Sequence, residues 1–143
     1  MKVRIGFVSN SSSSSFLVGI PTDKAEGLDL DSVKKMFGIL PGSIIDGIIG
    51  EELATTLLKN EWDAEYLLDN YGADSIDELV EDYCYGSGAK VKEELFRGLC
   101  AGKLRLFRLS GNSEDGSALD GMIYNCSMRS TIFEDGTIIH NDN

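Results

Sequence analysis

The sequence has few of the features that place a protein in a membrane or an oxidising compartment. No apolar run approaches the about 18–20 residues of a membrane helix. Lys2 and Arg4 resemble the basic start of a signal peptide, but the apolar segment Ile5–Val8 is too short to complete one. The three cysteines are odd in number and lack framework spacing, as is typical of reduced thiols. We therefore expect a cytoplasmic protein without membrane contact.

Basic residues are also scarce, with 13 Lys and Arg against 24 Asp and Glu and a net charge of −11. Such a charge repels nucleic-acid phosphates, so direct nucleic-acid binding is not expected. The imbalance is concentrated in residues 61–89, which hold nine acidic residues and no Lys or Arg. This segment is either a solvated helix face or a surface that binds a basic partner or imitates nucleic-acid phosphates.

What is present predicts one domain of α+β class. The 143 residues, 42% of them hydrophobic, are enough for a sizeable core. We expect strands joined by a serine-rich connection in residues 1–20, a helical region in 29–102 and a β-meander in 103–141. The N-terminal strands and the C-terminal antiparallel meander should form one sheet with the helical region packed on it, and residues 2–8 should pair with 103–109 or 122–128.

Several local signals mark the helices. Val33, Met36, Phe37 and Leu40 follow helical spacing, with Asp29 or Asp31 as N-cap and Gly38 near the end. Leu53, Leu57 and Leu58 mark another helix, which continues through Trp62 after a break. Ser75 and Glu78 form a capping box before a buried stripe of Ile76, Leu79, Val80 and Tyr83. The last helix contains Val91, Leu95 and Leu99 and should end at Gly102.

The C-terminal part reads as strands. Residues 103–109, 122–128, 129–134 and 137–140 are extended in this interpretation, and 111–121 is a polar loop. Asp135-Gly136 predicts a two-residue hairpin turn, because both positions would need positive φ.

Tests for known chemistry find no catalytic motif and no cofactor motif. The segment Gly98–Lys103 resembles a phosphate-binding P-loop but has the wrong spacing and ends a helix instead of opening one. A metal site would need Cys84, Cys100, Cys126 and His140 to converge without any paired spacing, so none is expected. Cys126 and His140 could form a nucleophile pair, but a core cysteine and a frayed terminal histidine explain them more simply.

The most unusual segment is a serine run near the start. It is either a connection between two strands or an anion site, in which amides and hydroxyls would surround a phosphate or carboxylate. Lys2 and Arg4 lie close by in the sequence and favour an anion. The candidate binding residues are Ser9, Asn10, Ser11, Ser12, Ser13, Ser14 and Ser15.

The string MKVRIGFVSNSSSSSF resembles the start of a scattered group of uncharacterised proteins from bacteria and their phages. Those proteins open with a short basic strand followed by Gly-Phe-Val-Ser/Thr-Asn and a serine run. The match covers residues 1–20. The resemblance implies a microbial or viral intracellular protein and assigns no function and no catalytic residue.

These observations favour a small acidic regulatory or inhibitory protein that binds another protein with a basic surface. Asp77, Glu81 and Asp82 form the candidate contact face, because they should point to water opposite the buried stripe of their helix. Two alternatives remain. One is an enzyme or receptor for a phosphorylated small molecule that uses the loop Ser9–Ser15, and the other is a structural subunit that assembles through an edge strand.

Overall fold

The computed structural model describes residues 13–27, 30–112 and 117–142 of the chain. The predicted strand at 2–8 lies outside the described residues. Along the chain the elements are β1 (Ser13–Pro21), α1 (Thr22–Glu26), α2 (Asp31–Met36), the π-helix η3 (Asp46–Gly50), α3 (Glu51–Leu58), β2 (Glu61–Trp62), α4 (Ala64–Tyr71), α5 (Ile76–Tyr83), α6 (Ala89–Cys100), β3 (Leu104–Asn112), α7 (Ala118–Tyr124), β4 (Thr131–Ile132) and β5 (Ile138–Asn141).

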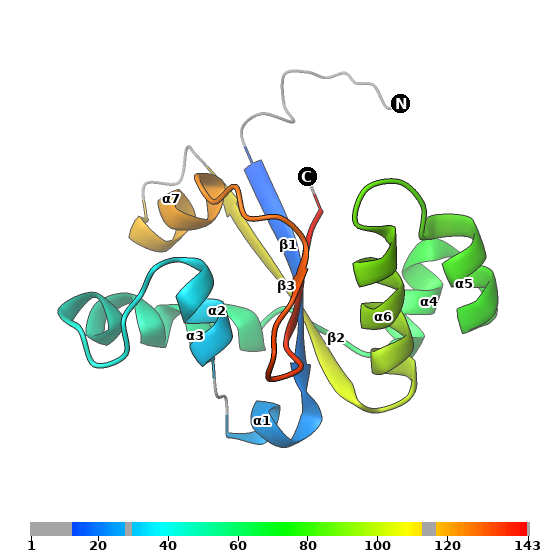
Figure 1. Ribbon diagram of the computed structural model, residues 1–143, viewed down its shortest axis with the longest axis horizontal. Helices are drawn as coiled ribbons and strands as arrows, with labels where there is room; N and C mark the ends of the chain where they lie inside the picture. The colour runs from blue at the N-terminus through cyan, green and yellow to red at the C-terminus, as the bar shows by residue number, and fades with distance from the viewer. Residues whose placement is uncertain (1–12, 28–29, 113–116, 143) are drawn as a thin grey trace.

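The strands form one antiparallel sheet in the order β2-β3-β1-β5-β4, which confirms the α+β class. β1 is the central strand, and its Phe16 lies opposite Leu109 of β3 on one side and Asn141 of β5 on the other. The C-terminal strands therefore do not follow one another as the expected meander. They are divided between the two sides of β1, because the N-terminal strand inserts between them (Figure 1).

Helices cover both faces of this sheet. In Figure 1, α2, α3 and α7 lie to the left of the strands, and α4, α5 and α6 lie to the right. Phe16 and Val18 of β1 face the first group, whereas Leu17 faces the second. All three are at most 1% exposed. Burial on both faces explains why Phe16–Ile20 lacks the alternation of polar and apolar residues that a half-exposed strand shows.

A glycine in the middle of β1 lets α6 approach the sheet. A Cβ at Gly19 would overlap Leu95 Cδ1 of α6 and lie 3.2 Å from Leu104 Cδ1 of β3. The backbone of β1 and the side chains of α6 are therefore in direct contact, and any larger residue would push the helix outward.

The local helix signals are largely confirmed. Ser75 caps α5 by accepting a hydrogen bond from Glu78 N at 3.2 Å, but the Glu78 carboxylate accepts from Asp74 N and not from Ser75 N. Gly102 has φ +75° directly after α6, where its left-handed conformation ends the helix. Asp31 is the first residue of α2, whose N-cap is Leu30 and not an aspartate.

Three assignments from the sequence are wrong. Glu61–Trp62 is an edge strand beside β3 instead of the end of a helix. Residues 118–124, expected as loop and strand, form α7, which Ser117 caps by accepting from Asp120 N. The hairpin turn is longer than two residues, since Gly136 N donates to Phe133 O and Phe133 N donates to Thr137 O. These bonds enclose three residues and leave Gly136, at φ +94°, in the left-handed position.

Candidate functional site

The serine run is only partly described, from Ser13 onward. Ser13, Ser14 and Ser15 are not a loop, since they extend β1 and lie opposite Asn112, Gly111 and Ser110 of β3. The Ser14 hydroxyl donates to Tyr124 O of α7 at 3.2 Å. An extended, paired strand does not have the alternating backbone conformation of an anion-binding nest. Ser9, Asn10, Ser11 and Ser12 lie outside the described residues, so an anion site there stays a prediction.

The acidic face on α5 has the expected orientation. Asp77, Glu81 and Asp82 are exposed, while Leu79 is fully buried. The other three residues of the stripe are half-buried. The helix thus presents its carboxylates to solvent along the side that faces away from the sheet.

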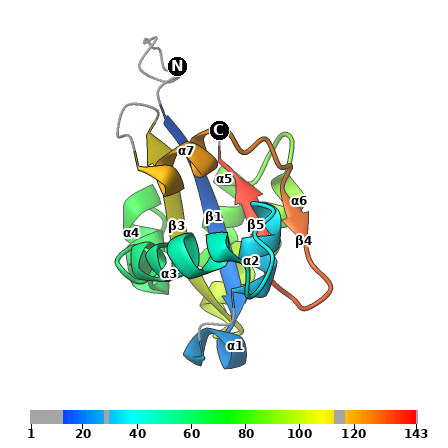
Figure 2. The same cartoon turned by 90° about the vertical axis from the view of Figure 1, so that its left-hand side faces the viewer.

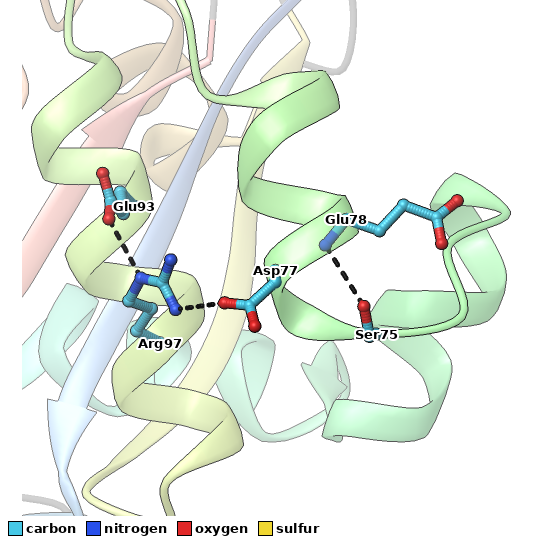
Figure 3. Close-up of polar contacts among 5 residues, drawn as sticks. All are labelled: Ser75, Asp77, Glu78, Glu93 and Arg97. Carbon is cyan, nitrogen blue, oxygen red and sulfur yellow. Dashed lines mark hydrogen bonds and ion pairs between the residues drawn. The ribbon is translucent and has the colours of Figure 1, made fainter.

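Asp77 is less available than the sequence suggested, because a neighbouring helix neutralises it. Arg97 of α6 donates to Asp77 Oδ1 at 3.1 Å and to Glu93 Oε2 at 2.9 Å (Figure 3). The hydrogen bonds to both carboxylates raise the pKa of Arg97 above its ordinary value. This arrangement ties α5 to α6 at the surface.

Other acidic residues of the 61–89 segment also have internal roles. Glu61 accepts two hydrogen bonds from Arg105 across β2 and β3, at 2.7 and 2.6 Å. These bonds lower the pKa of Glu61. Asp63 caps α4 by accepting from Tyr66 N. Within the described ranges Glu81 and Asp82 have no such partner, so the acidic face available for an external contact is centred on these two residues.

A second surface, which the sequence did not indicate, is an aliphatic patch between α2 and α3. It consists of Leu40, Ile44, Ile45 and Ile48, which are 71%, 83%, 53% and 65% exposed. Four large aliphatic side chains are thus exposed within nine residues of sequence, and exposed apolar groups gathered in this way commonly mark an interaction site. The segment lies at the left end of the molecule in Figure 1, opposite the end formed by α4 and α5.

The carboxylate of Asp46 fixes the segment that carries the aliphatic patch, residues 40–48, through polar contacts. Asp46 Oδ1 forms an ion pair with Lys34 of α2 at 2.9 Å, and Asp46 Oδ2 accepts from Gly42 N at 2.9 Å. The hydrogen bond from Gly42, with that from Lys34, lowers the pKa of Asp46. A Cβ at Gly50 would collide with the Asp46 carboxylate. The Asp46 carboxylate therefore points toward Lys34 of α2, whereas Ile45 and Ile48 on either side of it are exposed.

An open groove of about 510 Å³ continues the patch along α3. Ile48 lies at the junction, and the groove is also lined by Glu51, Glu52 and Lys59. Neither carboxylate forms an ion pair with any residue that the structure describes. Aliphatic and acidic groups therefore meet along one continuous surface.

Cys126 and His140 do not form the nucleophile pair considered above. Cys126 packs with α2 and α7 on one face of the sheet, together with Ile139 of β5. His140 follows Ile139 and projects to the opposite face, because side chains alternate along a strand. The His140 side chain is 5% exposed and hydrogen-bonded to Ser130, so His140 is not a frayed terminal residue either. Across residues 13–27, 30–112 and 117–142, no three His, Cys, Asp or Glu side chains are grouped to hold a metal ion.

Comparison with protein families, with curated proteins and with solved structures finds no match to this chain. The resemblance of residues 1–20 to bacterial and phage proteins therefore stays a prediction. In the described part of the chain, no helix has both the length and the apolar character needed to cross a bilayer.

Proposed function

We propose that the chain is a cytoplasmic protein-binding module that regulates or inhibits its partner. The observation that carries this proposal is the aliphatic patch of Leu40, Ile44, Ile45 and Ile48. Exposed aliphatic area is unfavourable in water, and a partner that covered it would gain roughly 25 cal/mol for each Å² buried. The segment is held in shape by the Lys34–Asp46 ion pair, so little order would have to be gained on binding.

The chemistry around the patch indicates what kind of partner fits. The groove beyond Ile48 carries the carboxylates of Glu51 and Glu52, and the whole chain has a net charge of −11. A protein segment with apolar side chains flanked by lysine or arginine would match both features. An amphipathic helix laid along α3 is one arrangement that satisfies this pattern.

The test replaces two residues of the patch, Ile44→Asp and Ile48→Asp, in one variant. Ile132→Asp is the matched control, because Ile132 is an exposed isoleucine on β4, outside the patch. Partners would be captured from the cells that carry the gene, and the binary affinity of each purified partner would then be measured. We expect the patch variant to lose about 100-fold or more in affinity, since each isoleucine contributes roughly 1.5–3 kcal/mol when buried. The control should bind like the wild type.

Equal affinities of the patch variant and the control would overturn the proposal. Light scattering on the purified chain provides a second criterion. If the wild type and the control are dimers and the patch variant is a monomer, a second copy of the chain covers the patch. This result would also contradict the proposal that a separate basic partner binds there.

The acidic face of α5 is a second proposed contact. It lies at the other end of the molecule from the patch (Figure 1), so one small partner would not cover both. Its support is the exposure of Glu81 and Asp82. The two surfaces can therefore be tested separately by variants that change only one of them.

A further inference from the structure

Ser130 and His140 form a hydrogen-bonded pair beside the start of α6. Ser130 precedes β4 and His140 lies in β5, with 2.9 Å between Ser130 Oγ and His140 Nδ1. The same Oγ accepts a hydrogen bond from Asn141 N, also at 2.9 Å. Two contacts thus fix the hydroxyl in one position against the imidazole.

The surroundings of the imidazole determine which nitrogen carries the proton. Asp142 Oδ1 lies 3.8 Å from Nε2, and a carboxylate favours a proton on the nitrogen that faces it. Nδ1 is then free to accept the Ser130 hydroxyl proton. Burial lowers the pKa of His140, with Lys92 of α6 acting in the same direction and Asp142 opposing. The ring is therefore neutral near pH 7 and can act as a base.

Helix α6 packs against β5 (Figure 2), and its first turn lies beside the pair. Gly88, the N-cap, has φ +78°, and a Cβ there would lie 3.1 Å from Ser130 Oγ and 3.3 Å from His140 Cε1. Glycine thus suits this position both conformationally and sterically. The partial positive charge at the start of this 12-residue helix stabilises negative charge that develops nearby.

An open pocket of about 540 Å³ gives access to the hydroxyl. It is lined by Ser87, Gly88, Arg129, Ser130 and Asn141. Arg129 is exposed, and its guanidinium forms no ion pair within the part of the chain that the structure describes. The pocket thus combines a polarised hydroxyl with a positive group that could hold a carboxylate or phosphate.

We propose that Ser130, with His140 as its base, is a nucleophile for the hydrolysis of carboxylic esters that carry a second, negatively charged group. The Ser130 hydroxyl transfers its proton to His140 Nδ1 while Oγ forms a bond to the ester carbonyl carbon. The tetrahedral intermediate collapses, the bond to the leaving oxygen breaks, and the imidazolium returns the proton to that oxygen. Water then repeats the sequence on the acyl-serine and releases the acid, so that one ester and one water give one acid and one alcohol.

Asp142 has a supporting part in this scheme. Its carboxylate faces Nε2 and stabilises the imidazolium while His140 holds the proton. Arg129 positions the anionic group of the substrate and takes no part in proton transfer.

The first experiment treats the purified chain with diisopropyl fluorophosphate and locates the adduct by peptide mass mapping. We expect one phosphorylated residue, Ser130, with fluoride as leaving group. Ser130→Ala should abolish the adduct, and His140→Asn should slow it by roughly 100-fold or more. Ser127→Ala is the control and should react like the wild type, because Ser127 is an exposed serine three residues away.

A wild-type chain that remains unmodified at Ser130, or in which several serines react at similar rates, would overturn the proposal. The wild-type map is decisive even if a variant fails to fold. The substrate class is tested by comparing 4-nitrophenyl acetate with mono(4-nitrophenyl) succinate. After the rate of each ester without protein is subtracted, because the succinate carboxylate also cleaves its own ester, we expect faster hydrolysis of the succinate and loss of that preference in Arg129→Gln. Equal rates for both esters in the wild type would contradict the anionic substrate.

Discussion

Asp77 of α5 and Arg97 of α6 are joined by an ion pair of 3.1 Å, and Arg97 also holds Glu93 of its own helix (Figure 3). One carboxylate of the acidic face therefore serves a contact within the chain. This separates Asp77 from Glu81 and Asp82, which lie on the same helix but have no cationic partner in the described ranges.

The first prediction uses this difference. Glu81→Lys and Asp82→Lys together should leave the free energy of unfolding within about 0.5 kcal/mol of wild type. The same double variant should lower the affinity for a basic partner that binds this face by about tenfold or more. Asp77→Lys should lower the melting temperature, because it places a lysine against Arg97. Thermal unfolding and binary affinity are the measurements. If the double variant binds its partner unchanged, the face of α5 only keeps the protein in solution.

The second prediction concerns the pH dependence of stability that arises from Asp135, in the hairpin between β4 and β5. Burial alone would raise the pKa of Asp135, but hydrogen bonds from Ser32 at 2.6 Å, from Thr137 N at 2.9 Å and from Lys24 at 3.0 Å outweigh it and hold the pKa well below its ordinary value. A depressed carboxyl pKa contributes stability that is complete above the unfolded-state pKa of about 3.9 and is lost as pH falls toward the folded-state value.

Asp135→Asn should therefore destabilise the chain by about 1 kcal/mol at pH 6, and the difference from wild type should shrink below about pH 4. Urea unfolding at a series of pH values measures this. Glu134→Gln, in the same turn but exposed, is the control and should follow the wild-type curve. A constant difference between Asp135→Asn and wild type down to pH 2 would show that the Asp135 contacts do not depend on its charge.

The third prediction concerns two glycines with opposite surroundings. Gly19→Ala should destabilise the chain by about 1–3 kcal/mol, because its Cβ would overlap Leu95. Gly121 lies inside α7 with nothing within 4 Å of an added Cβ. Gly121→Ala should therefore stabilise by up to about 1 kcal/mol through helix propensity. The midpoints of denaturant unfolding measure both changes. If Gly19→Ala does not alter the free energy of unfolding, α6 can move away from β1 at little cost.

The sequence predicted the elements that short-range chemistry controls. The Ser75 cap needs only a residue three positions later, and Gly102 ends α6 through its own backbone conformation. The strand β1 lies within residues 1–20, where the sequence predicts strands, and the apolar run Phe16–Ile20 forms most of it. Each signal lies within a few residues of the structure that it specifies.

Other parts depend on residues far away in the sequence. Glu61–Trp62 is a strand because β3 offers it an edge and Arg105 binds Glu61. Ile44, Ile45 and Ile48 have the spacing of a buried helix face. Only the fold shows that these three are exposed and that Ile49 is the buried isoleucine of this segment. The pairing of Ser130 with His140 requires the hairpin to bring together residues ten apart, so a single histidine in the sequence gave no indication of it.

The central position of β1 has a consequence for synthesis on the ribosome. β1 is made first among the described strands, yet its two neighbours are β3 and β5, which begin only at Leu104 and Ile138. Contacts between such distant segments form slowly. Until β5 has emerged, both apolar faces of β1 lack their full cover, and a nascent chain in that state is prone to aggregate or to bind a chaperone. The helices can form as they appear, but the sheet that organises them must wait until Ile138–Asn141 have been translated.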